Sequence, residues 1–294
     1  TNYDVTLENT SNDFKTLKVV AADNVSLKDT NAIVLGESTV SGTYTVTAVT
    51  GNITDSGTLA ITGLATFTTS ASNATITLDE TGSTFAAGVS LNTTGSSGNA
   101  TVDTGTNALD IAASTIGGNL ALTAGNHITD SGVITVGGTS SFTADVNDKT
   151  ITLSETHALT GAVSFTTAGT TGDVALTTGT TALILGTSTV NGDLAVTAGA
   201  AVTQSGALTI LGTTTVSASG NDVTLNLATN NFDSNNSGDR DVTITGKDVS
   251  IRDTDHIALG RQTISGNLTV QAGGNIDDGN ILTVSGTTTM TGGG

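Results

Sequence analysis

The sequence has no cysteine, no proline and no tryptophan, and only 3% of its 294 residues are aromatic. Without cysteine, disulfides and thiolate metal sites are excluded. With so few rings, a core has to be built from valine, isoleucine, leucine and alanine. The missing proline suits a chain whose backbone N–H groups are nearly all used in strand ladders, because proline cannot donate to one. No apolar run approaches the roughly 18 residues of a spanning helix, so the sequence predicts no membrane span.

Basic residues are also scarce. The 8 Lys and Arg stand against 26 Asp and Glu, which gives a net charge of −18. Such a charge disfavours nucleic acid and anionic membrane surfaces as partners. Because the acids are scattered along the chain, they predict a solvated, self-repelling surface rather than an acidic tail.

What the sequence has in excess is threonine, its commonest residue, together with glycine, which occurs 37 times. Thr, Ser, Asn and Gly are poor residues for helix interiors, so the composition argues against a helical protein. The mean hydropathy is +0.12, and β-branched residues are abundant. Both features argue against disorder.

The chain repeats itself with a period of about 74 residues. Four matching stretches follow one another at nearly equal spacing: Thr30–Gly36, Thr106–Ala112, Thr180–Gly186 and Thr254–Gly260. A second matched position holds glycine in every copy: Gly63, Gly138, Gly212 and Gly286. We interpret residues 1–294 as one segment with three complete repeats and a partial one at each end: 1–29, 30–105, 106–179, 180–253 and 254–294.

The N-terminal partial repeat fits the same scheme. Val25–Thr30 matches Val249–Thr254, and Asp4–Leu7 matches Asp222–Leu225. The two offsets differ by six residues, which predicts an insertion of that length within Asp233–Asp239 of the last copy.

Apolar residues alternate with Thr or Ser, as in Leu120–Thr123 and Ile151–Ser154, which is the pattern of a half-buried strand. Short strands in such a repeat fit a β-solenoid, whose strands pair in parallel from coil to coil, or a row of small β-sandwiches. The core columns hold lone aliphatic residues and the copies lack linkers, so we favour the solenoid. The sequence therefore predicts an all-β, elongated parallel β-helix.

The number of coils in one repeat is left open. Three coils of about 20 to 30 residues fit best, and four of about 18 are the alternative. Three coils would place Leu120, Leu194 and Leu268 along one buried face.

The runs Ser188–Gly199 and Val202–Ile210 resemble the repeats of filamentous-haemagglutinin-like exoproteins, as do Asn12–Phe14 and Thr180–Val190. These are very large bacterial proteins exported by two-partner secretion or autotransporter-like routes. The resemblance covers essentially the whole chain. It implies a right-handed parallel β-helix shaft, an extracellular or cell-surface location, and roles in adhesion, aggregation or biofilm formation. It supplies no catalytic residues.

Residues suited to catalysis or metal binding are sparse. We interpret the three histidines, His127, His157 and His256, as surface or turn residues, because a metal site needs several converging ligands. No serine has a histidine and an acid at a recognisable spacing. The sequence predicts no enzyme activity and no catalytic, cofactor or metal site.

Three carboxylate pairs are the candidates for acid–base catalysis: Asp277 with Asp278, Asp253 with Asp255, and Asp239 with Asp241. Asp278 shares its column with Asp55, Asp130 and Gln204, where capping of a turn explains the residue type. A glycosidase needs two carboxyls facing across a cleft. The sequence shows no long loops that would build one.

Other patterns have simple interpretations. Gly273–Asn280 loosely resembles a calcium-binding nonapeptide but occurs once, so incidental Ca²⁺ binding stays an alternative. Thr-rich stretches such as Thr213–Thr215 are too uneven for an ice-binding array.

The Gly138 column predicts turns with positive φ or no room for a Cβ. Most basic residues lie in the end copies, where we expect them to be solvated: Lys15, Lys18, Lys28, Lys247, Arg252 and Arg261.

These observations predict a structural shaft segment of a bacterial extracellular fibre or surface adhesin, acting in adhesion, aggregation or filament formation. The alternatives are a glycan-binding module, which would need exposed aromatics, and a polysaccharide-degrading enzyme. Expected partners are further copies, end to end or side by side, and a cell-surface or glycan receptor. Both chain ends fall inside repeats, so we expect exposed strand edges there, with continuation or end-to-end joining.

Overall fold

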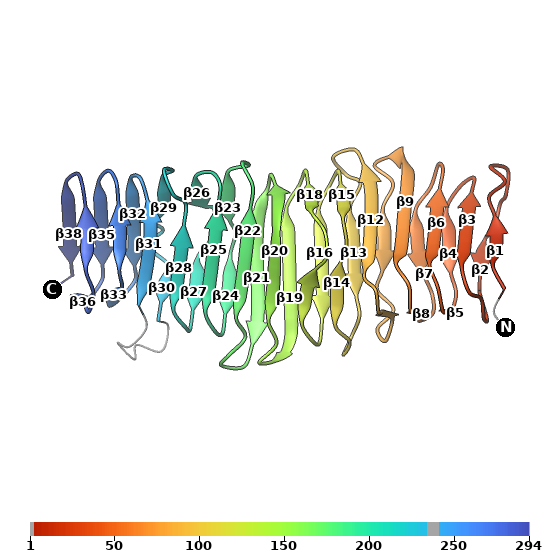
Figure 1. Ribbon diagram of the computed structural model, residues 1–294, viewed down its shortest axis with the longest axis horizontal. Coiled ribbons are helices and arrows are strands. Elements are labelled where there is room, and N and C mark those ends of the chain that lie inside the picture. The colour runs from red at the N-terminus through yellow and green to blue at the C-terminus, as the bar shows by residue number, and fades with distance from the viewer. Residues whose placement is uncertain (1–2, 234–240, 294) are drawn as a thin grey trace. The chain divides into compact units, whose positions relative to one another are not determined.

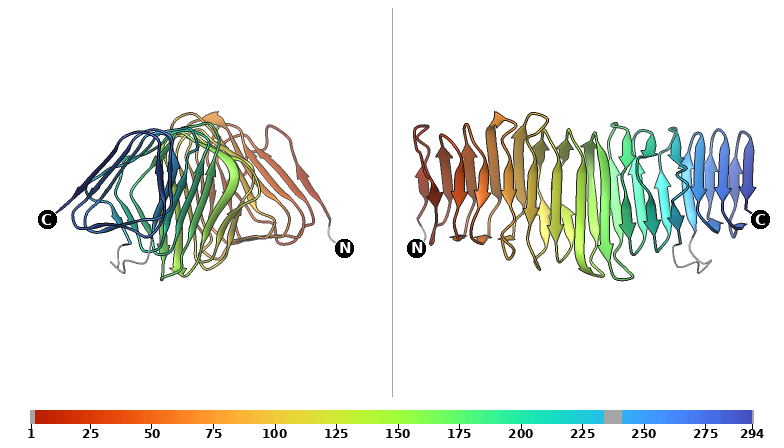
Figure 2. Two further views of the ribbon diagram at one scale, coloured as in Figure 1. Left: turned by 60° about the vertical axis from the view of Figure 1, so that its left-hand side comes forward. Right: turned by 180° about the vertical axis from the view of Figure 1, so that it is seen from behind.

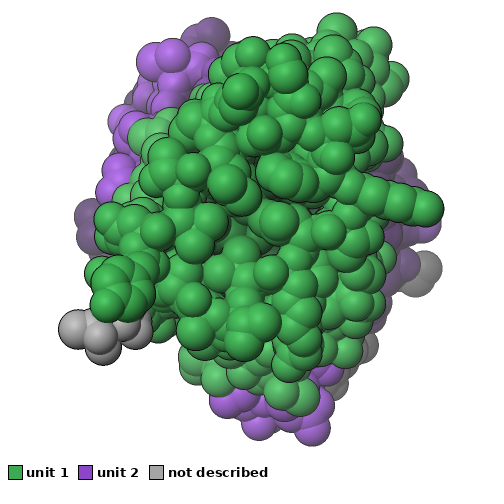
Figure 3. Space-filling model, turned by 90° about the vertical axis from the view of Figure 1, so that its right-hand side faces the viewer, with its two compact units in different colours: residues 1–143 green, residues 144–294 purple. Residues whose placement is uncertain are grey.

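The computed structural model describes residues 3–233 and 241–293, and every regular element in them is a β-strand. The chain divides into two compact units, residues 1–143 and 144–294 (Figure 3). Each unit is a β-solenoid whose strands pair in parallel with those one turn away (Figure 1). The predicted parallel solenoid is thus confirmed, and the row of sandwiches is not observed. Within the described residues, no helix has the length and apolarity needed to cross a membrane.

Unit 1 winds between two walls of stacked strands. Wall 1A consists of β1 (Val5–Leu7), β3 (Val25–Asp29), β6 (Tyr44–Ala48), β9 (Ala65–Ser72), β12 (Val89–Thr94), β14 (Leu109–Ile111), β15 (Ser114–Ile116), β17 (Ile128–Asp130) and β18 (Ile134–Val136). Wall 1B consists of β2 (Thr16–Leu17), β4 (Ile33–Leu35), β7 (Ile53–Asp55), β10 (Ile76–Leu78), β13 (Ala100–Asp103) and β16 (Leu120–Ala124). A small third sheet lies beside wall 1B: β5 (Ser38–Val40), β8 (Leu59–Ile61) and β11 (Thr84–Phe85). The boundary between the units falls within β19 (Ser140–Asn147).

Unit 2 also winds between two walls of stacked strands, which can be followed from behind in Figure 2. Wall 2A consists of β20 (Ile151–Leu159), β22 (Val174–Thr178), β25 (Leu194–Ala198), β28 (Thr214–Ser217), β31 (Val242–Gly246), β33 (Ile257–Leu259), β34 (Gln262–Ile264), β36 (Ile276–Asp278) and β37 (Leu282–Val284). Wall 2B consists of β21 (Ala162–Ala168), β23 (Leu183–Leu185), β24 (Ser188–Val190), β26 (Val202–Gln204), β27 (Leu208–Ile210), β29 (Val223–Leu225), β30 (Asn231–Phe232), β32 (Val249–Asp253), β35 (Leu268–Ala272) and β38 (Thr288–Gly292).

The core of each unit lies between its walls. In β6, Tyr44, Val46 and Ala48 are buried, while Thr45 and Thr47 point outward. Branched and aliphatic side chains suit such a pleated surface because they pack well against the same position of the next strand. The alternation read from the sequence therefore gives one apolar and one threonine-rich face to each strand.

Turn length varies between strands. In wall 1A, Val25 pairs with Tyr44 and Tyr44 pairs with Ala65, so these two successive turns are nearly equal in length. In wall 2A, Thr214 pairs with Val242, which makes that turn clearly longer. The insertion predicted within Asp233–Asp239 belongs to the long turn, and of its residues only Asp233 is among those described.

One repeat takes three and a half turns, neither three nor four. From Leu194 in wall 2A, successive pairings in that wall lead to Thr214, Val242 and Leu259. Leu268, the counterpart of Leu194 in the next repeat, lies half a turn further on, in wall 2B. In unit 1 the matched pair Tyr44 and Leu120 is likewise divided between walls 1A and 1B.

The prediction that Leu120, Leu194 and Leu268 share one face is therefore wrong, although all three are buried. The half turn has a local cause. Through most of a repeat one long strand alternates with a pair of short ones, but at its end two long strands, β31 and β32, follow each other directly. The number of half turns is consequently odd, and matched residues change walls from one repeat to the next.

The outward threonines form continuous columns. One column of wall 2A follows the strand pairings residue for residue: Thr177, Thr197, Ser217, Thr245, Thr263 and Thr283. The corresponding column of wall 1A also contains one lysine and one asparagine. Its members are Lys28, Thr47, Thr68, Asn92, Thr115 and Thr135. Turn lengths vary along the chain, but these columns keep their register because the variation is confined to the turns.

Candidate functional site

The polar side chains at the turns form hydrogen-bonded ladders along each unit. In unit 2 the Oδ1 atom of Asp173 accepts the backbone N–H of Asp193 at 2.8 Å, and Oδ1 of Asp193 accepts that of Thr213 at 2.7 Å. In unit 1 Oδ1 of Asn119 accepts the N–H of Thr139 at 2.9 Å in the same way. Each side chain thus accepts a backbone N–H group from the next turn of the solenoid. These acids and amides are used to hold the fold.

A second ladder of unit 2 runs along the turns that lead into wall 2B. Oδ1 of Asp248 accepts the N–H of Asn267 at 2.8 Å, and Oδ1 of Asn267 accepts that of Thr287 at 2.9 Å. The hydrogen bond from Asn267 holds the pKa of Asp248 below its usual value. Lys247 Nζ lies 3.5 Å from Asp248 Oδ2, in an ion pair that is exposed to solvent. Such a pair contributes little to stability.

The glycine column predicted from the repeats lies against these ladders. A Cβ on Gly138 would lie 2.2 Å from Oδ1 of Asn119 and 2.7 Å from the carbonyl oxygen of Gly118. A Cβ on Gly212 would lie 2.2 Å from Oδ1 of Asp193. Gly138 does not have a positive φ. Of the two reasons offered for this column, lack of room for a Cβ is therefore correct.

The three histidines do not come together in a site. His127 belongs to unit 1 and is exposed. In unit 2, His157 is buried within β20, and His256 lies in a turn with Nδ1 3.6 Å from Oδ2 of Asp277. The expected surface or turn position is thus wrong for His157. Across residues 3–233 and 241–293, no three His, Asp or Glu side chains gather as metal ligands.

The carboxylate pairs have different surroundings. Asp253 is buried, and its two oxygens accept the backbone N–H groups of Phe232 at 2.8 Å and Asp255 at 2.9 Å. Burial raises the pKa of Asp253 to about 7. Asp277 and Asp278 are exposed on β36. Asp239, predicted as the partner of Asp241, lies outside the described residues.

Two members of the column shared by Asp55, Asp130, Gln204 and Asp278 cap turns, namely Asp55 and Gln204. Oδ1 of Asp55 accepts the N–H of Asp79, one turn on, at 3.0 Å, and its burial raises its pKa to about 6. Gln204 donates from Nε2 to the carbonyl oxygen of Gly206 at 2.9 Å. Capping, the role predicted for this column, is what these two side chains do.

The stretch Gly273–Asn280 is a solenoid turn followed by a strand. The N–H of Gly273 donates to Asp253 O at 3.2 Å, and that of Gly274 donates to Asp255 O at 2.6 Å. A Cβ on Gly273 would lie 2.0 Å from the carbonyl oxygen of Thr254. The glycines are explained by this close packing. Calcium binding here stays an untested alternative.

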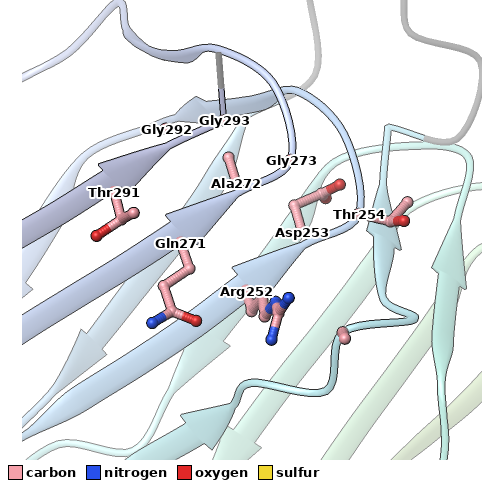
Figure 4. Close-up of a pocket in the computed structure, with 10 residues that line it drawn as sticks. Arg252, Asp253, Thr254, Gln271, Ala272, Gly273, Thr291, Gly292 and Gly293 are labelled. Atoms are coloured by element: carbon pink, nitrogen blue, oxygen red, sulfur yellow. The ribbon is translucent and has the colours of Figure 1, made fainter.

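A groove of 340 Å³ in unit 2 was not found by sequence reasoning, and Figure 4 shows most of its lining. Arg252 pairs with Gln271, and Gln271 pairs with Thr291, so a guanidinium, an amide and a hydroxyl follow one another on β32, β35 and β38. Gly273 and Gly293, which directly follow β35 and β38, also line the groove. No motif in the sequence marks this groove, because its residues come from three successive turns.

Known proteins match the chain through its repeats. A family described as repeats of unknown function (DUF5649) matches residues 22–92, 97–166, 171–237 and 246–294. The chain belongs to this family. Its successive DUF5649 matches begin at positions 22, 97, 171 and 246, a spacing that agrees with the period read from the sequence. No curated protein and no solved structure matches the chain.

Proposed function

We propose that this chain of DUF5649 repeats is a structural shaft segment of a bacterial extracellular fibre or surface adhesin. The observation that carries the proposal is how its polar residues are used. The Asp and Asn side chains of the turns, such as Asp193 and Asn267, accept backbone N–H groups of the next turn. The outward columns of the walls are mostly hydroxyl groups. A chain whose polar groups mainly hold a repeated scaffold together is suited to serve as the shaft of a longer fibre.

The extracellular location rests on the sequence. The resemblance of Ser188–Gly199 and Val202–Ile210 to filamentous-haemagglutinin-like repeats favours export. The absence of cysteine is compatible with any redox compartment. The net charge of −18 favours a well-solvated surface.

Surface display can be tested on intact source cells. The experiment labels them with an antibody raised against residues 1–294, and treats a parallel sample with a protease that does not enter cells. We expect surface labelling that the protease removes, while a cytoplasmic marker is spared. A chain found only after lysis would contradict the extracellular role. Loss of aggregation or adhesion on deletion would support the adhesin function itself.

A glycan-binding module is the second candidate, and the groove at Arg252, Gln271 and Thr291 favours it. Guanidinium, amide and hydroxyl groups in a row can hydrogen-bond sugar hydroxyls. A glycan array probed with the purified chain tests this. Binding that is lost in Arg252→Ala and Gln271→Ala, but kept in Thr197→Ala on wall 2A, would support the module.

A further inference from the structure

Asn267 belongs to a column of turn residues that match from repeat to repeat. Its counterparts are Asn119 and Asp193. In Asn267, Asn119 and Asp193, Oδ1 accepts a backbone N–H of the next turn at 2.9, 2.9 and 2.7 Å. Asp193 has no amide nitrogen, yet it makes the same contact. The Nδ2 group of Asn267 is therefore not required for the ladder.

The residue two positions further on distinguishes these three places. Asn267 lies two residues before Thr269, which gives the Asn-x-Thr acceptor sequence of N-linked glycosylation. Asn119 has Ala121 at the corresponding place, and Asp193 lacks the amide. Of the three, only Asn267 combines the amide with the hydroxyl.

The strand pattern turns both of these groups outward. Leu268, between them, is buried in β35, whereas Asn267 is exposed and Thr269 is half-exposed. They line a groove of 200 Å³ on wall 2B, where Thr269 pairs with Ser250 and Ser250 pairs with Thr224. A sugar on Nδ2 of Asn267 has room in this groove and a row of hydroxyls with which to hydrogen-bond.

The same combination occurs in unit 1. Amides that accept a backbone N–H of the next turn, two residues before a hydroxyl, are found at Asn24, Asn52, Asn73 and Asn99. The Nδ2 atom of Asn24 donates to Asp4, and Asn99 is half-buried. Asn52 and Asn73 are exposed. These two positions therefore match Asn267 in both chemistry and exposure.

We propose that Asn52, Asn73 and Asn267 are sites of N-linked glycosylation. In the reaction Nδ2 attacks the anomeric carbon of a sugar that is activated as a glycosyl diphosphate. The N–C bond forms as the C–O bond to the diphosphate breaks, the diphosphate leaves with the electron pair, and one Nδ2 proton passes to a base of the transferase. The amide oxygen is unchanged, so each residue keeps the hydrogen bond that holds the next turn.

The first experiment analyses the chain as the source cells make it, taken from whole-cell extracts. Peptide mass spectrometry with electron-transfer fragmentation, which leaves the glycosidic bond intact, assigns any added sugar to a residue. We expect sugar on Asn52, Asn73 and Asn267, and none on Asn119. Unmodified peptides at all three sites, or sugar carried by Thr269 in place of Asn267, would overturn the proposal.

Matched variants expressed in the source cells test the acceptor sequence. Thr269→Ala should abolish the modification of Asn267, whereas Thr269→Ser should keep it, because serine also supplies the hydroxyl. Ala121→Thr should create a new site at Asn119, which already holds the matched place in the ladder. Sugar on Asn267 that persists in Thr269→Ala, or an unmodified Asn119 in Ala121→Thr, would contradict the assignment.

Stability separates the two roles of Asn267. Asn267→Asp keeps the Oδ1 acceptor, as Asp193 does, so it should lose the sugar but not the ladder hydrogen bond. Asn267→Ala should lose both and melt at a lower temperature. The melts use chain from a host that adds no sugar. Equal midpoints for Asn267→Asp and Asn267→Ala would show that the ladder needs the amide nitrogen, against the proposal.

This proposal goes beyond the shaft function and does not depend on it. Mass spectra of whole-cell extracts report the modification wherever the chain is located, and surface labelling reports location alone. Either proposal can therefore fail without the other.

Discussion

Leu194 and Leu268 hold the same position in successive repeats, yet Leu194 lies in wall 2A and Leu268 in wall 2B. Each DUF5649 repeat of this chain advances the solenoid by a half-integral number of turns. A surface feature encoded once per repeat is therefore presented alternately on the two walls of the unit. Only every second repeat shows it on the same wall.

The half-turn can be checked with paired cysteines, because the chain has none of its own. Thr197 pairs with Ser217 in wall 2A, so Thr197→Cys with Ser217→Cys should form a disulfide under mild oxidation. Adjacent strands lie about 4.8 Å apart, within disulfide reach. Thr197→Cys with Gln271→Cys, which would be aligned if one repeat took whole turns, should stay reduced. Electrophoresis without reductant reads both, and efficient linkage of the second pair would contradict the division between walls.

Gly138→Val should destabilise unit 1. Its Cβ would meet Oδ1 of Asn119 at 2.2 Å and a backbone oxygen at 2.7 Å, and overpacking of this kind costs about 1–3 kcal/mol. Thr139→Val, at the next and exposed position, keeps the N–H that Asn119 accepts and should be nearly neutral. Thermal melts of the two variants beside the parent measure the difference. Equal midpoints for all three would show that the ladder can move aside without cost.

The turn ladders predict a difference between two substitutions of Asp193. Asp193→Ala removes the acceptor of the Thr213 N–H and should lower the free energy of unfolding by about 1 kcal/mol. Asp193→Asn keeps an acceptor oxygen and places a neutral group beside Asp173, so it should be neutral or slightly stabilising. Chemical denaturation at two salt concentrations measures both. Equal losses in the two variants would argue against the hydrogen bond as the cause.

Asp253 predicts a pH dependence of stability. Its pKa is raised to about 7 by burial, above the usual carboxyl value, so the folded state binds the proton more tightly than the unfolded state. Its contribution is fully present below about pH 4 and is lost as pH rises through about 7. Asp253→Asn should flatten the stability profile between these values. Melting curves from pH 4 to 8 measure it, and an unchanged profile in the variant would assign the dependence to other groups.

Asp55 makes the same prediction for unit 1 over a narrower range. Burial raises its pKa to about 6, and the N–H groups of Asp79 and Glu80 oppose the shift. Stability contributed by its protonated form should be lost as pH rises from about 4 to 6. Asp55→Asn should remove that loss, whereas Asp130→Asn in the same column serves as a comparison. Hydrogen exchange of the amides of β7 and β10 at pH 5 and 7 would locate the effect.

The amino-acid sequence by itself determined the strands, the repeats and the kind of fold. Alternation of apolar residues with threonine is a local property, and it specified which side chain of each strand, such as Leu120, is buried. The lone aliphatic residues of the matched columns and the lack of linkers favoured parallel stacking over a row of β-sandwiches. The sequence also revealed the glycine column, because glycine occupies the same matched position in every repeat.

The tertiary structure alone decided what depends on distances between turns. Whether a repeat takes three, three and a half or four turns depends on how β31 and β32 follow one another, and turn lengths do not reveal this. The reason that Gly138 must be glycine is Asn119, a neighbour in space from the turn before. The burial of Asp253 and the hydrogen bond that it accepts from the N–H of Phe232 likewise depend on the stacking of successive turns. The strand pattern and the repeat period are local properties that can be read from the sequence. Contacts between side chains of different turns depend on how the chain winds and can be read only from the structure.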